Sequence, residues 1–155
     1  MEPRKLKDQW GRTLDYLRIA VTDRCNLRCF YCMPAEGIQY LPKTQLLTYE
    51  ELLKLVEIFG ELGVRKVRLT GGEPFARRDM VDFMAGLSKI DHIQKLHITT
   101  NGVLTHPFLD QLQEMKISGV NLSLDTIDKN KFFEITRRDV FDDVMKTFHG
   151  LLERG

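Results

Sequence analysis

Residues 16–32 read YLRIAVTDRCNLRCFYC, and this stretch joins an expected β-strand directly to a cysteine-rich loop. Apolar side chains alternate with polar or small ones over residues 16–22, which is the period of a strand with one buried face. The loop carries all three cysteines of the chain, Cys25, Cys29 and Cys32, within eight residues. The fold therefore depends on whether such a strand is repeated, and the chemistry depends on what three closely spaced thiols can bind.

The alternation of strand and amphipathic helix recurs along the chain. Further strands are expected at residues 66–70, 96–101 and 120–125. The helix before residue 66 should begin with a capping box at residues 48–51 and end at Gly63. The apolar stripes of the expected helices are Leu52, Leu55, Val56, Phe59 and Leu62; Met80, Phe83, Met84 and Leu87; Leu109, Leu112 and Met115; and Phe141, Val144, Phe148 and Leu151. Four consecutive βα units predict a parallel sheet with right-handed crossovers.

Every expected strand keeps one polar face. Its members are Arg18, Thr22, Lys66, Arg68, Thr70, His97, Thr99, Asn101, Asn121, Ser123 and Asp125. A flat sheet covered by helices on both sides would bury them unpaired, at about 1–3 kcal/mol each. We therefore predict an α/β fold, a partial (βα) barrel of about four units, whose concave face binds a polar ligand near the carboxyl ends of the strands. The alternative is a set of exposed edge strands with merely solvated polar side chains.

The cysteine spacing favours an iron–sulfur cluster with an open site. Three cysteine ligands hold three irons of a [4Fe–4S] cube and leave the fourth iron free. A structural zinc site usually has four protein ligands, and no histidine lies near the cysteines in sequence. An odd cysteine count and a charged amino terminus argue against disulfides in a secreted protein, so a cytoplasmic location is expected. Zinc and unligated thiols remain open alternatives.

Composition narrows the classes of function. The chain has 155 residues, 43% of them hydrophobic, which suits one compact domain. A formal net charge of +1 gives no reason to expect nucleic acid or an anionic membrane as a partner. No apolar run reaches the ~18 residues that a membrane span needs.

A glycine-rich turn, Gly71-Gly72-Glu73-Pro74, follows the second expected strand. The two glycines permit backbone angles and close approaches that side chains would block. Alone, the string is typical of a tight turn, and the chain contains no phosphate-binding glycine motif. Beside a cluster, backbone groups of this turn could hold the ammonium group of a ligand against the open iron.

Together these motifs resemble the radical S-adenosylmethionine superfamily. The resemblance rests on the CxxxCxxC spacing, the aromatic Tyr31 before the last cysteine, and the Gly-Gly-Glu-Pro turn one βα unit later. It implies that Cys25, Cys29 and Cys32 hold a [4Fe–4S] cluster and that S-adenosylmethionine chelates the open iron. A reductant protein would supply an electron, and the cofactor would yield a 5′-deoxyadenosyl radical that abstracts hydrogen from a substrate.

Within that superfamily the chain resembles the GTP 3′,8-cyclases. The matching segments are residues 11–12, 16–26, 67–74, 99–102 and 121–125. The resemblance implies a lyase that converts GTP to (8S)-3′,8-cyclo-7,8-dihydroguanosine 5′-triphosphate in the first step of molybdopterin biosynthesis. By position, the implied cofactor contacts are Tyr31, Gly71, Gly72, Glu73 and Ser123, and the implied GTP contacts are Arg18, Arg68 and Thr99.

Each implied contact has a structural alternative. Either arginine could form an ion pair with Glu73 or Asp125, and Tyr31 could pack against its own loop. Ser123 and Thr99 could be ordinary strand hydroxyls. The Arg-Arg-Asp runs at residues 77–79 and 137–139 are typical of solvated helix starts.

The chain also departs from the cyclase pattern. That family carries a second cluster, on three further cysteines in its C-terminal part, and more βα units than the four found here. We therefore expect an incomplete core domain over residues 1–155, with an N-terminal extension at 1–15, four βα units at 16–155 and an unpaired edge at the fourth strand. A homodimer or the missing C-terminal portion could complete it. Three hypotheses follow: a cyclase fragment active only with that portion, a core serving another substrate such as a peptide, and a non-catalytic metal-binding module.

Overall fold

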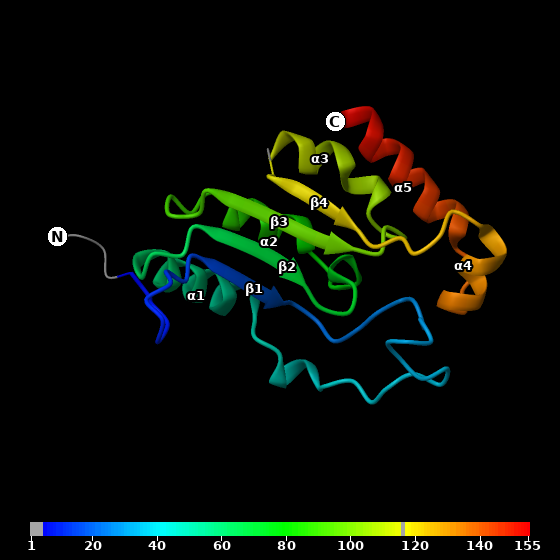
Figure 1. Cartoon of the computed structure of the whole chain (residues 1–155), viewed down its shortest axis with the longest axis horizontal. Helices are drawn as coiled ribbons and strands as arrows, with labels where there is room; N and C mark the ends of the chain where they lie inside the picture. Colours follow the sequence, from blue (N-terminus) through cyan, green and yellow to red (C-terminus); the bar gives the residue numbers. More distant parts are fainter. Residues whose placement is uncertain (1–4, 116) are drawn as a thin grey trace.

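Four parallel strands form the expected sheet. The computed structural model describes residues 5–115 and 117–155. The strands are β1 (Tyr16–Ala20), β2 (Lys66–Thr70), β3 (Lys95–Thr100) and β4 (Gly119–Leu122). They pair in the order β1-β2-β3-β4, so each strand lies beside its neighbour in sequence (Figure 1). The positions of all four strands were predicted, but β1, β3 and β4 end one to three residues earlier than expected.

Helices follow the strands as the periodicity predicted. They are α1 (Tyr49–Glu61), α2 (Met80–Leu87), α3 (Leu109–Glu114), α4 (Lys129–Thr136) and α5 (Phe141–Arg154), with short 3-10 turns η1 (Lys43–Gln45), η2 (Pro74–Ala76) and η3 (His106–Phe108). The capping box of α1 is confirmed, because the Thr48 hydroxyl accepts the Glu51 N–H while the Glu51 carboxylate accepts the Thr48 N–H. Gly63 follows the helix with a φ of 102°, a left-handed conformation that favours glycine.

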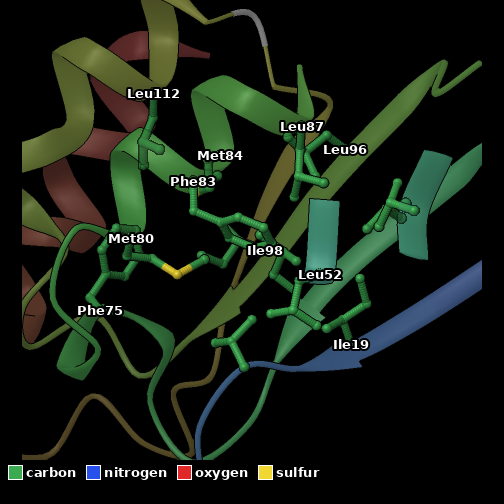
Figure 2. Close-up of a cluster of buried hydrophobic side chains, with 14 of the residues drawn as sticks. Ile19, Leu52, Phe75, Met80, Phe83, Met84, Leu87, Leu96, Ile98 and Leu112 are labelled. Carbon is green, nitrogen blue, oxygen red and sulfur yellow. The ribbon is translucent and has the colours of Figure 1, made fainter. Parts of the chain in front are cut away.

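The hydrophobic core lies on one side of the sheet, between the strands and helices α1, α2 and α3. Val67, Leu69 and Ile98 point from the strands into this layer and are fully buried. Figure 2 shows Leu52 of α1 and the α2 side chains Phe83 and Met84 packed against the strand residues. One apolar face per strand is therefore enough to build the core.

The opposite face of the sheet is open to solvent and polar. Along β1 the exposed Arg18 and Ala20 alternate with the more buried Leu17 and Ile19, and β2 and β3 show the same alternation. Figure 1 shows the helices α1 and α2 behind the strands, with the near face of the sheet uncovered. This one-sided arrangement confirms the α/β partial barrel with about four βα units.

The edge of the sheet at β4 is unpaired in the described part of the chain, as expected for the fourth strand. Within the described residues, β4 pairs with β3 alone, so its other edge is free. Before β1, a bridge joins Lys7 to Thr13, while the first four residues of the expected N-terminal extension lie outside the described part of the chain. Among the described helices, none has both the length and the apolar character needed to cross a membrane.

Candidate iron–sulfur and cofactor site

The three cysteines lie on the segment that leaves the carboxyl end of β1. All three thiols are free; Cys25 and Cys29 are half-buried, and Cys32 is exposed. The Cys29 carbonyl accepts the N–H groups of Cys32 and Met33, each at 2.9 Å, which closes a helical turn around the last two cysteines. The CxxC spacing therefore places Cys29 and Cys32 at the two ends of one hydrogen-bonded turn.

Burial raises the pKa values of Cys25 and Cys29. For Cys25 the other raising influences are the charges of Glu73 and Cys32, while N–H donors from Leu27 and Asn101 oppose them. For Cys29 they are the charges of Cys25, Cys32 and Asp125. The three sulfurs therefore interact electrostatically, and a bound cation would stabilise all three thiolates together.

The thiols do not form a site for a single metal ion. In the described part of the chain, no group of three or more Cys, His, Asp or Glu side chains is gathered closely enough to hold one ion. A cube has a different requirement, because each cysteine ligates a separate iron. The three free cysteine thiols on this loop match the ligands of such a cube in both type and number.

Helix α4 holds the cysteine loop on its other side. The N–H groups of Arg28 and Phe30 each donate, at 3.0 Å, to carbonyls at the end of α4. The guanidinium of Arg137 donates to the carbonyls of Arg28 at 3.3 Å and Met33 at 3.1 Å. These carbonyls bracket the last two cysteines. Arg137 itself ends α4 with a φ of 55°.

The Arg-Arg-Asp runs are more structural than the sequence suggested. Arg77 donates to the carbonyls of Val21 and Leu47, both at 2.7 Å, and its guanidinium lies over the Tyr49 ring. Arg77 and Arg137 thus each hold backbone carbonyls of the segments that follow β1. The interpretation of both runs as solvated helix starts was therefore wrong for their first arginines.

The glycine-rich turn packs directly against the segment before the cysteines. Its backbone N–H groups at Gly72 and Glu73 donate to the carbonyls of Thr22 and Arg24, at 2.8 Å and 2.7 Å. A Cβ at Gly71 would collide with the Thr22 carbonyl, and one at Gly72 with the Arg24 carbonyl. Gly71 also has a φ of 136°. The glycines are therefore required by the contact between the two loops.

Glu73 is buried beneath this turn and does not face the polar side of the sheet. One carboxylate oxygen accepts the Phe75 N–H at 3.1 Å and the Thr100 hydroxyl at 2.8 Å. The other accepts the Asn101 N–H at 2.7 Å. Burial raises the pKa of Glu73, and these donors partly offset the rise. Both oxygens are occupied by protein donors, so any contribution to cofactor binding would act through the turn.

Asn101 connects the cysteine loop to the end of β3. Its side-chain nitrogen donates to the Asn26 side-chain oxygen at 2.8 Å and lies 3.7 Å from the Cys25 sulfur. Sequence reasoning placed Asn101 on the polar face but did not assign it this contact. The available signal was its position as the last residue of an expected strand, at the edge of the sheet where the cysteine loop also begins.

Tyr31 and Ser123 lie near the carboxyl ends of the outer strands. The Tyr31 hydroxyl donates to Asp125 at 2.7 Å, which raises the pKa of the phenol. Ser123 is exposed, and its backbone N–H donates to the Thr100 carbonyl at 2.8 Å. Asp125 thus anchors the tip of the cysteine loop to the segment after β4.

The expected GTP contacts lie on the open face of the sheet. Arg18 of β1 and Arg68 of β2 are direct partners in the strand register, and Arg68 is in turn the partner of His97 in β3. The Nε of Arg68 is buried without a hydrogen-bond partner. Thr99 is half-buried beside Asn121 of β4. The strands therefore bring the two arginines side by side. Thr99 lies on β3, two residues beyond the register partner of Arg68.

The structural alternative for these arginines finds no support in the described residues. No ion pair joins Arg18 or Arg68 to Glu73 or Asp125. Burial lowers the pKa of His97, with smaller contributions from the positive charges of Arg68, Lys66 and Lys95. This face is therefore positively charged, as an anionic ligand would require.

Several curated proteins are similar to this chain over most of its length. A GTP 3′,8-cyclase of Thermodesulfovibrio yellowstonii is 50% identical over 142 residues, which is 91% of this chain and 44% of that protein. A GTP 3′,8-cyclase of Petrotoga mobilis is 43% identical over 148 residues, 96% of this chain and 46% of that protein. Molybdenum cofactor biosynthesis protein 1 of Homo sapiens is 47% identical over 150 residues, 97% of this chain and 24% of that protein. The chain thus spans less than half the length of these relatives.

Solved structures support the fold. Streptococcus suis SuiB bound to S-adenosylmethionine superposes with a TM-score of 0.72 at 24% identity, over 91% of this chain and 32% of that chain. HydG, a maturase of the [FeFe]-hydrogenase, gives a TM-score of 0.67 at 18% identity, over 90% of this chain and 33% of that chain. The family profile of the Radical SAM superfamily matches residues 19–155. Because that match extends from the first strand to the last helix, the chain belongs to the radical SAM superfamily.

Proposed function

We propose that this chain is the cluster- and cofactor-binding portion of a GTP 3′,8-cyclase, a lyase that acts on GTP. The observation that carries the proposal is its 43–50% identity, over nine-tenths or more of the chain, to two proteins of that name. The charged open face adds support, because Arg18 and Arg68 lie side by side there without a carboxylate partner among the described residues. Guanidinium groups suit phosphate or purine acceptors.

Under this proposal the loops at the carboxyl ends of the strands hold the cofactors. Cys25, Cys29 and Cys32 would hold the [4Fe–4S] cluster, and backbone groups of Gly71 and Gly72 would bind S-adenosylmethionine. Tyr31 and Ser123 would complete the cofactor contacts, and Glu73 would keep the glycine turn in place. The chemistry that these groups supply when bound is reductive cleavage of the cofactor sulfonium bond.

The polar face would hold the nucleotide. Arg18 and Arg68 would bind and orient GTP through its phosphate or purine acceptors, and Thr99 would donate or accept one further hydrogen bond. Half-burial of Arg68 and Thr99 strengthens such contacts, because water competes less. The free edge of β4 leaves this face open on one side, so turnover would require the portion of the relatives that this chain does not span.

The remaining partners follow from the same proposal. An external reductant protein would deliver the electron to the cluster, and a reducing compartment such as the cytoplasm would keep the three thiols free. The rest of the polypeptide or a second copy would cover the open edge. We propose residues 1–155 as one incomplete core.

Cofactor loading tests the first part of the proposal. After anaerobic reconstitution, the wild-type chain should bind near four irons and four sulfides and should retain S-adenosylmethionine, whereas Cys29→Ser should lose most of both. Stoichiometric zinc in place of iron would overturn the proposal. Cleavage of S-adenosylmethionine to 5′-deoxyadenosine by the reduced protein would further support it.

Nucleotide binding tests the substrate. GTP should bind the loaded chain, and Arg68→Ala should weaken binding at least tenfold, the cost of about one charge-assisted contact. Arg78→Ala is the matched control, because Arg78 is an exposed arginine outside the four strands. Loading and cofactor cleavage without any GTP binding would reject GTP while keeping the superfamily chemistry, and a peptide substrate would then be the next candidate.

A further inference from the structure

Asn101 occupies a position where its backbone N–H and both polar groups of its side-chain amide are engaged. Its backbone N–H donates to the buried Glu73 carboxylate at 2.7 Å, and its side-chain oxygen accepts the Val103 N–H at 3.0 Å. Its side-chain nitrogen donates to the Asn26 oxygen at 2.8 Å and lies 3.7 Å from Cys25 Sγ. The residue therefore links the glycine turn, the end of β3 and the cysteine loop.

The orientation of the Asn101 amide follows from these partners. Val103 offers an N–H, so the amide oxygen must face it. The amide nitrogen then faces the Asn26 oxygen and the Cys25 sulfur, both of which are acceptors. A flipped amide would place an oxygen against both acceptors and a nitrogen against a donor. The donor that points at the sulfur is thus determined by the surrounding chain.

Cys25 differs from the other two cysteines in its amide donors. A second N–H, from the Leu27 backbone, lies 3.4 Å from the same sulfur. Among the described contacts, no side-chain amide reaches the sulfur of Cys29 or Cys32. The Leu27 donor belongs to the loop itself and would follow it in any conformation. Asn101 directly follows β3, so of these two donors only its side chain ties the Cys25 sulfur to the sheet.

We propose that Asn101 is a positioning residue that holds the Cys25 sulfur against the end of β3 and raises the reduction potential of the cluster bound there. The inference rests on the proposed function only in requiring that the three cysteines bind a [4Fe–4S] cluster. An N–H dipole directed at a ligand sulfur stabilises the additional negative charge of the reduced cluster, so it favours reduction. The Asn26 side chain, held by the same amide, keeps the donor in place.

The test compares two substitutions that change the side chain but leave the backbone bond to Glu73 intact. Asn101→Asp keeps the oxygen that accepts from Val103 and replaces the donor with a negatively charged acceptor. Asn101→Ala removes both. Asn121→Asp is the matched control, because Asn121 is exposed on β4 of the same sheet face and introduces the same charge without touching a cysteine sulfur.

The full chain and each variant are reconstituted anaerobically, analysed for iron and sulfide, and titrated electrochemically with the paramagnetic reduced cluster as the signal. Asn101→Asp should shift the equilibrium toward the oxidised cluster at least tenfold, which is about 59 mV for a one-electron couple. Asn101→Ala should shift it in the same direction by less, and Asn121→Asp by less than half as much as Asn101→Asp. Partial loss of iron in the Asn101 variants, with full iron in Asn121→Asp, would support the positioning role if the clusters that remain show the shifted potential, and would overturn it if they keep the wild-type potential.

Two further results would overturn the inference, and they differ from each other. Fully loaded Asn101 variants with the wild-type potential would remove the role of Asn101 and leave the proposed function standing. A wild-type chain that assembles no cluster would reject both. The potential distinguishes a donor to sulfur from a merely structural residue, because a structural defect lowers occupancy without moving the potential of the clusters that do form.

Discussion

Glu73 and Asn101 are joined by a 2.7 Å hydrogen bond from the Asn101 backbone N–H to the buried Glu73 carboxylate. Because the same carboxylate accepts from Phe75 and Thr100, it is a three-donor site within the protein. Replacing it with glutamine leaves one acceptor oxygen and points an NH₂ group at a donor. We expect Glu73→Gln to lower the free energy of unfolding by about 1–3 kcal/mol. Urea denaturation measures the free energy of unfolding. The control is Glu57→Gln, at an exposed position, which should change that free energy by less than about 0.5 kcal/mol.

The same residue predicts a pH dependence. Burial raises the pKa of Glu73 in the folded protein above its unfolded value, so the folded state binds more protons between the two pKa values. The contribution of Glu73 to stability is therefore greatest below the unfolded pKa, near 4.3, and declines as the pH rises through the folded pKa. The difference in unfolding free energy between wild type and Glu73→Gln should shrink over that range. A difference that grows with pH would contradict the burial argument.

Arg137 provides a prediction about the cysteine loop. Its guanidinium donates to the carbonyls of Arg28 and Met33, on either side of the last two cysteines. We expect Arg137→Ala to speed amide hydrogen exchange at residues 28–33 by about fivefold to a hundredfold, the equivalent of about 1–3 kcal/mol. Arg138→Ala is the control, since the hydrogen bond that the Arg138 side chain donates within the described part of the chain goes to the adjacent carbonyl of Arg137. Equal exchange in both variants would mean that the backbone bonds to α4 hold the loop alone.

Arg137→Lys separates charge from geometry. A lysine keeps the positive charge but cannot present two fixed donors to two carbonyls. Exchange in Arg137→Lys should therefore resemble that in Arg137→Ala more closely than wild type. Full protection with lysine would show that one donor is sufficient.

Gly72 and Gly86 offer a contrast between two glycines. A Cβ at Gly72 would collide with the Arg24 backbone carbonyl, which is fixed by its bond from the Glu73 N–H. The atoms nearest to a Cβ at Gly86, inside α2, would be the two terminal carbons of the flexible Leu53 side chain, at 3.2 Å and 3.3 Å. Gly72→Ala should lower the melting temperature by about 4–12 °C, the equivalent of about 2–3 kcal/mol for a domain of this size, whereas Gly86→Ala should leave it unchanged or raise it. Similar melting temperatures for the two variants would show that the turn can shift to admit the methyl group.

The features predictable from the sequence were those that neighbouring residues determine. The period-2 pattern at Arg18 and Ile19, the capping box at Thr48 and the βα order all depend on contacts within a few positions, and all are present. The sequence also indicated that Arg18 and Arg68 share a face, because both strands alternate in the same sense. This is why the open polar face could be expected before the structure was known.

Contacts between loops were harder to predict, because they depend on where each loop lies in space. Asn101 and Cys25 are 76 positions apart, and Arg137 and Arg28 are 109 apart. Periodicity says nothing about which carbonyl an arginine will reach across such a separation. For the same reason the sequence did not reveal that the Glu73 carboxylate turns inward to donors at the end of the next strand. The parallel sheet brings these loops to one edge, but the individual partners follow from their backbone paths.

The pair Arg68 and His97 gives a prediction for the open face. The two residues are register partners on β2 and β3, and the arginine charge adds to the effect of burial in lowering the pKa of His97. Removing that charge in Arg68→Met should raise the pKa of His97 part of the way toward its ordinary value, with burial and the two lysines keeping the rest of the shift. Arg78→Met should not change it. Proton NMR titration of the four histidines, with His97→Gln to assign the signal, measures the change. Added salt should reduce the difference between wild type and Arg68→Met, since ions screen charges at a partly exposed site. An unchanged His97 pKa in Arg68→Met would mean that burial alone lowers it and that the open face carries less positive potential than a nucleotide site requires.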